Sequence, residues 1–129
     1  MILCCGEALI DFLPRKTADG AAAYEPVCGG SVYNTAIALG RLDVPVGLFT
    51  GLSTDFFGDM LRDGLKASKV SLSFIKDWDR PSTLAFVKLT KGHARYSFFD
   101  DNSAGRMLTR RDLPKLARSI QALHFGSIS

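Results

Sequence analysis

The residues best suited to ligand chemistry in this sequence are a pair of glycines and an asparagine that follows them. Gly29 and Gly30 lack side chains, so a ligand can approach their backbone closely. A helical pattern starts immediately afterwards, and we expect its first backbone N–H groups to face the same ligand. Asn34, in the first turn, adds a side-chain donor and acceptor. The alternative is that Gly29-Gly30 is only a strand-to-helix turn, with Asn34 on the helix surface.

A carboxylate inside an apolar run is the second candidate. Asp11 lies within residues 8–13, where donors or charge partners must offset the cost of burying it. Two adjacent hydroxyl groups of a polyol can both donate to one carboxylate, so Asp11 on a first strand favours a sugar ligand. The competing interpretation is a structural anchor for neighbouring backbone.

Hydrophobic periodicity predicts the elements that must position these residues. We expect strands at residues 2–5, 46–50, 72–75 and 122–125. Helices are predicted at 31–42 with Ser31 as N-cap, at 55–68 with Asp55 as an N-terminal charge, and at 109–118 opened by Thr109 and Asp112. Two hairpins are expected, one from residues 8–13, stopped by Pro14, and 22–27, the other from 83–90 and 94–99 joined by 91–93. The alternation predicts an α/β fold, a parallel sheet with crossover helices.

Composition excludes several classes of protein. The chain has 129 residues, 47% of them hydrophobic, and a net charge of +3 from scattered basic residues, which argues against a nucleic-acid or membrane-surface partner. Three cysteines, two of them adjacent, do not form a secreted disulfide framework, so we expect a reducing, cytoplasmic location. The sequence shows neither a signal peptide nor an apolar run long enough to span a membrane.

Taken in order, several segments resemble the ribokinase-like, or PfkB, family of carbohydrate kinases, and within it the fructokinases. The resemblance covers the whole chain, and its segments are residues 6–14, 29–42, 51–61, 81–87, 102–104 and 123–129. It implies a Rossmann-like, ribokinase-type core and a small β lid with strands within residues 8–27 and 83–99. The sugar-binding residues it implies are Asp11 and Asn34 for hydroxyl groups, Gly29 and Gly30 for backbone approach, and Phe98 or Phe99 as an apolar wall.

The function implied by this resemblance is ATP-dependent phosphorylation of a ketohexose, with fructose as the expected substrate. The alternatives within the family are 2-keto-3-deoxygluconate and other sugars. Asp100 stands where the family usually has an arginine, and a carboxylate there would repel a sugar acid.

The family's Gly-Ala-Gly-Asp motif, which carries the general base, has no counterpart in residues 1–129. We therefore expect the N-terminal portion of a longer domain, inactive alone, with no catalytic, cofactor-binding or metal-binding residue in this segment. ATP and Mg²⁺ are the implied cofactors, and a homodimer through the lid is the implied assembly. A hypothesis of another class is a non-catalytic sugar-binding or dimerising fragment.

Overall fold

The computed structural model describes residues 1–90 and 93–126. Its elements follow in the order β1 (Ile2–Cys5), β2 (Leu9–Lys16), β3 (Ala22–Gly29), α1 (Ser31–Arg41), β4 (Val46–Ser53), α2 (Phe56–Ala67), β5 (Ile75–Trp78), β6 (Thr83–Thr90), β7 (His93–Phe99), the 3-10 helix Arg110–Asp112 and β8 (Ala122–Phe125). The strands form two four-stranded sheets.

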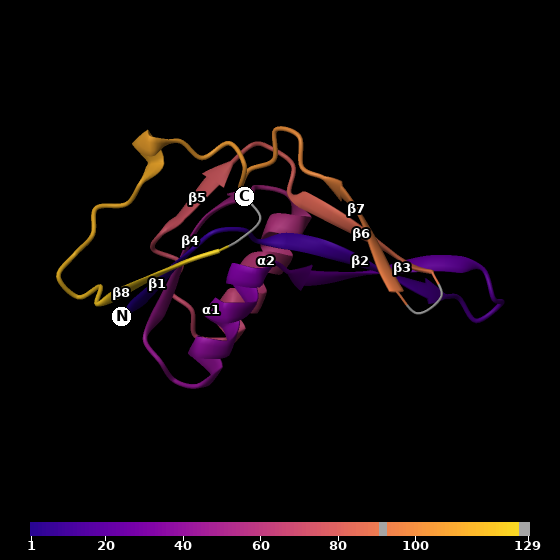
Figure 1. Ribbon diagram of the computed structural model, residues 1–129, viewed down its shortest axis with the longest axis horizontal. Coiled ribbons are helices and arrows are strands. Elements are labelled where there is room, and N and C mark those ends of the chain that lie inside the picture. The colour runs from indigo at the N-terminus through magenta and orange to yellow at the C-terminus, as the bar shows by residue number, and fades with distance from the viewer. Residues whose placement is uncertain (91–92, 127–129) are drawn as a thin grey trace.

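The first sheet has the strand order β5-β4-β1-β8, and all three of its strand pairs are parallel. Helix α1 packs against its two central strands, β1 and β4, and helix α2 packs against β4 (Figure 1). Every residue of β4 is buried, as expected for a strand that is covered on both faces. The predicted α/β fold with a parallel sheet and crossover helices is confirmed.

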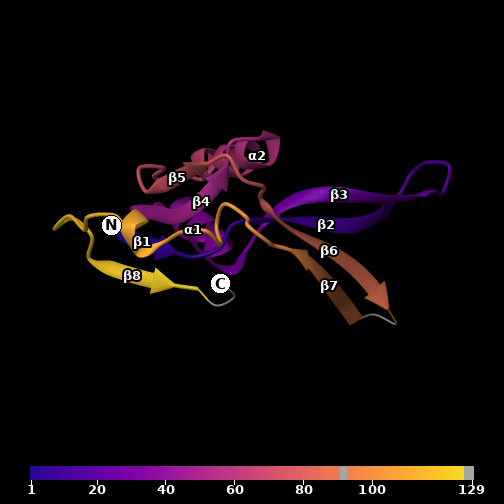
Figure 2. The same ribbon diagram turned by 90° about the horizontal axis from the view of Figure 1, so that it is seen from above.

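The second sheet has the order β3-β2-β6-β7 and is made of two antiparallel hairpins joined by a parallel pair, β2 and β6. Figures 1 and 2 show it projecting from one side of the α/β unit. Both predicted hairpins are confirmed. Residues 91 and 92 of the predicted connection lie outside the described residues, and His93, predicted to belong to that connection, is the first residue of β7.

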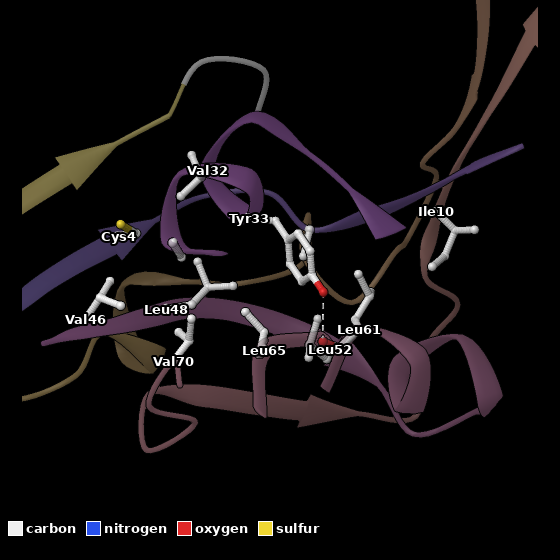
Figure 3. Close-up of a cluster of buried hydrophobic side chains, with 12 residues drawn as sticks. Cys4, Ile10, Val32, Tyr33, Val46, Leu48, Leu52, Leu61, Leu65 and Val70 are labelled. Atoms are coloured by element: carbon white, nitrogen blue, oxygen red, sulfur yellow. Dashed lines mark hydrogen bonds between the residues drawn. The ribbon is translucent and has the colours of Figure 1, made fainter. Parts of the chain in front are cut away.

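The main hydrophobic core lies between α1, α2 and β4 (Figure 3). The Tyr33 hydroxyl of α1 donates a hydrogen bond to the Leu61 carbonyl oxygen of α2, at 3.1 Å. A side chain at Gly64 would collide with this hydroxyl, because its Cβ would lie 2.2 Å from Tyr33 Oη. This contact packs α1, which starts next to the glycine pair, closely against α2.

The prediction that Pro14 ends the second strand was wrong, since β2 continues to Lys16. Pairing of β2 with β6 stops at Phe12 and Phe86, while pairing with β3 runs on to the end of the strand. Proline lacks a backbone N–H, but here β2 no longer has a partner on the β6 side. The missing donor is therefore tolerated.

The strand predicted at 72–75 lies three residues further along, at Ile75–Trp78. Its position is set by long-range pairing, because Ile75 stands opposite Thr50 and Trp78 opposite Ser53. Local sequence pattern carries no information about this register.

The helix predicted at 109–118 is a single 3-10 turn, Arg110–Asp112. The predicted capping residues are in place, because Thr109 Oγ1 accepts from the Arg111 N–H at 3.3 Å and Asp112 Oδ2 accepts from the Thr109 N–H at 2.7 Å. The turn does not continue because Pro114 lacks an N–H and disfavours the helical conformation at the residue before it.

Candidate functional site

Asp11 and Phe98 lie in one row of side chains across the second sheet. Asp11 stands opposite Val27 on one side and Ala85 on the other, and Ala85 stands opposite Phe98. Residues in direct register project from the same face of a sheet. With neighbouring strands about 5 Å apart, the backbones of Asp11 and Phe98 are about 10 Å apart, with the small residue Ala85 between them in the row.

Phe99 projects from the opposite face. It stands opposite Leu84, which in turn stands opposite Ile10, a fully buried core residue. Its ring makes an edge-on contact with Phe86 at a centroid distance of 5.5 Å. Of the two phenylalanines proposed as an apolar wall, only Phe98 shares a face with Asp11.

The Asp11 carboxylate lies directly over Gly29. A Cβ atom at Gly29 would be 2.2 Å from Asp11 Oδ2, so only glycine leaves room for the carboxylate in this position. Burial raises the pKa of Asp11, and no hydrogen bond from residues 1–90 or 93–126 lowers it. The partly desolvated carboxylate therefore retains its capacity to accept hydrogen bonds from a ligand.

The start of α1 differs from the sequence prediction. Its N-cap is Gly30, with φ +108°, and not Ser31. Gly30 has no side chain, so it cannot cap the helix with a side-chain hydrogen bond. Glu7 replaces the cap: its Oε1 accepts from the backbone N–H of Ser31 at 2.8 Å and of Val32 at 3.4 Å. The prediction that these N–H groups face a ligand was therefore wrong, because a carboxylate of the protein already occupies the helix N-terminus.

Sequence reasoning missed Glu7 because it lies 24 positions before Ser31, and no short motif links the two. One signal was available: α1 has neither a capping side chain at Gly30 nor an acidic residue in its first turn. The first backbone N–H groups of such a helix need hydrogen-bond acceptors from elsewhere in the chain. Asn34, on the same first turn, is exposed, and its backbone N–H donates to the Gly30 carbonyl oxygen at 2.9 Å.

A cavity of about 340 Å³ adjoins this site, and it is lined by Glu7, Leu9, Thr83, Phe98, Asp100 and Arg106, among others. Asp100 is the centre of its polar wall. It accepts hydrogen bonds from Thr83, from Ser103 at 2.6 Å and from Arg106 at 3.1 Å. Burial alone would raise the pKa of Asp100, but these hydrogen bonds and the Arg106 charge outweigh burial and lower it. Asp100 therefore carries a fixed negative charge at neutral pH.

A larger cavity, of about 720 Å³, lies between β1, β8 and the segment that precedes β8. Its walls are mostly apolar and include Leu113, Leu116, Leu123 and Phe125. All four of these side chains are at least 41% exposed. Gly105 and Arg106 line both cavities, whereas none of the predicted sugar-binding residues lines the apolar one.

Comparison with known proteins identifies the family. The model for the pfkB family carbohydrate kinases matches residues 1–129. The chain belongs to this family. Among its pfkB relatives, a fructokinase of Rhizobium leguminosarum bv. trifolii is 55% identical over 129 residues, which are 100% of this chain and 40% of that protein.

Solved structures of pfkB kinases share the fold. A crystal structure of fructokinase from Xylella fastidiosa superimposes with a TM-score of 0.84 at 29% sequence identity, covering 96% of this chain and 40% of that one. A second structure of the Xylella fastidiosa fructokinase, with bound ATP, gives a TM-score of 0.80 at 32% identity, covering 88% and 37%. The chain thus spans about 40% of the length of the pfkB kinases it matches.

No helix in the described part of this pfkB chain is long and apolar enough to cross a membrane. Nor do the described residues contain a group of three or more His, Cys, Asp or Glu side chains that could hold a metal ion.

Proposed function

We propose that this chain is the sugar-binding part of a fructokinase, which transfers a phosphoryl group from ATP to a ketohexose, with fructose as substrate. The observation that carries the proposal is the Asp11 carboxylate, which is partly desolvated, lies over Gly29 and shares a sheet face with Phe98. Such a carboxylate suits two sugar hydroxyl groups, and the phenyl ring suits the apolar C–H groups of the sugar and helps to exclude water. Gly30 follows Gly29, and the Asn34 N–H donates to the Gly30 carbonyl oxygen, so both residues belong to the proposed sugar site.

The charges around the polar cavity favour a neutral sugar. Glu7, Asp100 and Asp101 line it, and the guanidinium of Arg106 is paired with Asp100. A sugar acid such as 2-keto-3-deoxygluconate would bring another carboxylate beside these groups, at a cost in binding free energy. Neutral ketohexoses are therefore the proposed substrate class, and sugar acids are the weaker alternative.

We further propose that ATP and Mg²⁺ are bound by protein outside these residues. The support is that the chain spans about 40% of its relatives' length, and that one Xylella fastidiosa fructokinase structure contains ATP. Mg²⁺ would be bound together with the ATP phosphates, because proteins usually hold it through one or two carboxylates and the substrate phosphates. The apolar cavity beside β8 supports the same proposal, because a further layer of chain would bury Leu113, Leu116 and Phe125 there.

We also propose that the protein forms a homodimer and is located in the cytoplasm. Tyr96, Phe98 and Phe99 leave at least half of their side chains exposed on β7, the edge strand of the second sheet, which supports a homodimer formed through this lid-like sheet. All three cysteines are free, which supports a reducing cytoplasm.

The test is a hybrid kinase, in which residues 1–129 are followed by the remaining part of the Rhizobium leguminosarum fructokinase. We expect it to phosphorylate fructose in the presence of ATP and Mg²⁺, faster than it phosphorylates 2-keto-3-deoxygluconate, and we expect the 129 residues alone to transfer no phosphate. Phosphate transfer is followed with a panel of sugars, and circular dichroism reports folding. A folded hybrid that phosphorylates none of them contradicts the proposal. Fructose binding without transfer would instead favour the rival hypothesis of a non-catalytic sugar-binding fragment.

The two phenylalanines of β7 provide an internal comparison. Phe98→Ala in the hybrid kinase is expected to raise the KM for fructose about fivefold or more, because it removes an apolar wall on the Asp11 face. Phe99→Ala is expected to leave this KM within about twofold and to lower stability by about 1 kcal/mol through loss of the Phe86 contact. Steady-state kinetics and thermal melts separate the two effects. Equal KM values for the two variants would show that the face assignment does not govern sugar binding.

A further inference from the structure

Glu7 provides the hydrogen-bond acceptors for the first three backbone N–H groups of α1. Its side-chain Oε1 accepts from Ser31 and Val32, and its main-chain carbonyl oxygen accepts from the Tyr33 N–H at 3.2 Å. The first N–H groups of a helix have no partner within the helix, and a negative charge at this end also interacts favourably with the helix dipole. Glu7 therefore stabilises the start of α1 in two ways.

Gly30, the second glycine of the pair, packs against the backbone of the same residue. A Cβ atom at Gly30 would lie 2.9 Å from the Glu7 carbonyl oxygen and 3.3 Å from Ala8 Cα. Gly30 is thus pressed against the β1–β2 junction while its neighbour Gly29 faces Asp11. The position of Glu7 determines how far the Gly29-Gly30 turn extends toward the proposed sugar.

The second carboxylate oxygen of Glu7 is buried on the other side of the acidic group. The side chain is only 8% exposed, and Oε2 is buried without a hydrogen-bond partner among residues 1–90 and 93–126. A Cβ atom at Gly126, just after β8, would lie 3.1 Å from it. The carboxyl group is therefore enclosed between the start of α1 and the end of β8, and a buried charge of this kind is costly unless the helix N-terminus compensates it.

We propose that Glu7 is a positioning residue for sugar binding: by holding the first turn of α1, it sets the positions of Gly29, Gly30 and Asn34. This inference rests on the proposed function, because it takes those residues as the sugar contacts. Glu7 itself does not act on the reacting atoms. Its loss is expected to weaken sugar binding and to leave ATP binding unchanged.

The chain offers a matched control in the N-cap of α2. Asp55 Oδ1 accepts from the backbone N–H groups of Phe57 and Gly58, each at 3.0 Å, so it also caps a helix through two N–H groups. Removing either cap is expected to lower the melting temperature by a similar amount. Only the cap on α1 adjoins residues assigned to the sugar.

The experiment compares Glu7→Ala, Glu7→Gln and Asp55→Ala in the hybrid kinase. We expect Glu7→Ala to raise the KM for fructose about tenfold, with kcat and the KM for ATP within about twofold of the parent. Glu7→Gln retains an oxygen for the Ser31 and Val32 N–H groups, so it should restore most of the sugar affinity. Asp55→Ala should lower the melting temperature without changing the KM for fructose. A fructose KM that stays at the parental value in Glu7→Ala, or rises equally in Asp55→Ala, overturns the proposal.

Backbone hydrogen exchange tests the same role without any phosphate transfer. In Glu7→Ala, peptides that contain residues 29–34 should exchange faster, while peptides of α2 should be unaffected, and Asp55→Ala should give the reverse pattern. Unchanged exchange at residues 29–34 overturns the positioning role even if the hybrid is an active kinase. If the unmodified hybrid folds but phosphorylates no sugar, the proposed function fails separately from this result.

Discussion

Asp11→Asn in the hybrid kinase is expected to raise the KM for fructose at least about tenfold and to leave the KM for ATP unchanged. The substitution keeps the size of the side chain but replaces one of two acceptor oxygens by an NH₂ group and removes the charge. Hydrogen bonds to a charged group contribute about 1.5–3 kcal/mol, against about 1 kcal/mol for neutral pairs. Because two sugar hydroxyl groups are proposed to donate to Asp11, the binding free energy of the sugar should fall by most of this difference in the variant.

The same variant should gain stability, which separates loss of a ligand contact from misfolding. Burial raises the pKa of Asp11 in the folded chain, so the ionised form is less favourable when folded than when unfolded. This penalty is present above the folded-state pKa and disappears as the pH falls below the unfolded-state value. The melting temperature of Asp11→Asn should therefore exceed that of the parent at pH 7, and the difference should shrink near pH 3.

Sugar kinetics and melting curves of Asp11→Asn together check the assignment. If the KM values for fructose and ATP rise equally, Asp11 does not contact the sugar. A melting temperature below that of the parent at pH 7 would instead show that Asp11 anchors the neighbouring backbone, which is the structural alternative for a carboxylate in a strand.

Gly30→Ala is expected to have the second large effect, on both stability and sugar binding. Gly30 has φ +108°, and a Cβ atom there would lie 2.9 Å from the Glu7 carbonyl oxygen, which is a backbone atom that cannot easily move. This backbone conformation alone costs a residue with a side chain about 1–3 kcal/mol. The contact with Glu7 adds to this cost and would displace the turn, so we expect the KM for fructose to rise about tenfold.

Gly20→Ala is the matched control for Gly30→Ala. Gly20 also has a positive φ, +86°, but a Cβ atom there would meet nothing within 4 Å. The Gly20→Ala variant should lose about 1–2 kcal/mol of stability from the backbone conformation and keep the parental KM for fructose. Thermal melts and fructose kinetics measure both quantities. Equal effects of the two variants on the fructose KM would mean that general strain, and not the position of the turn, limits binding.

Local patterns predicted the parts of the fold that local forces decide. The alternation of strands and helices, both hairpins and the place of Asp55 at the start of α2 follow from side-chain period and turn residues, whereas the hydrogen bonds by which Asp55 caps α2 come from the structure. The glycine pair and Asp11 also stand out in the sequence, because small residues before a helix and a carboxylate in an apolar run are unusual. Their placement against each other in the structure makes the site hypothesis more specific, and their role in binding a sugar stays a prediction.

The tertiary structure decided the features that depend on partners far away in the chain. Strand register places Phe98, and not Phe99, on the face of Asp11, since a shift of one residue moves a side chain to the other face of a sheet. Pairing with β4 places β5 three residues further along the chain than the local sequence pattern predicts. The cap of α1 comes from Glu7, 24 positions before the first N–H group that it binds. Residue types and spacing thus indicate which groups can do chemistry. Long-range strand pairing and side-chain packing decide which of these groups meet, because pairing and packing leave no signal in a short stretch of sequence.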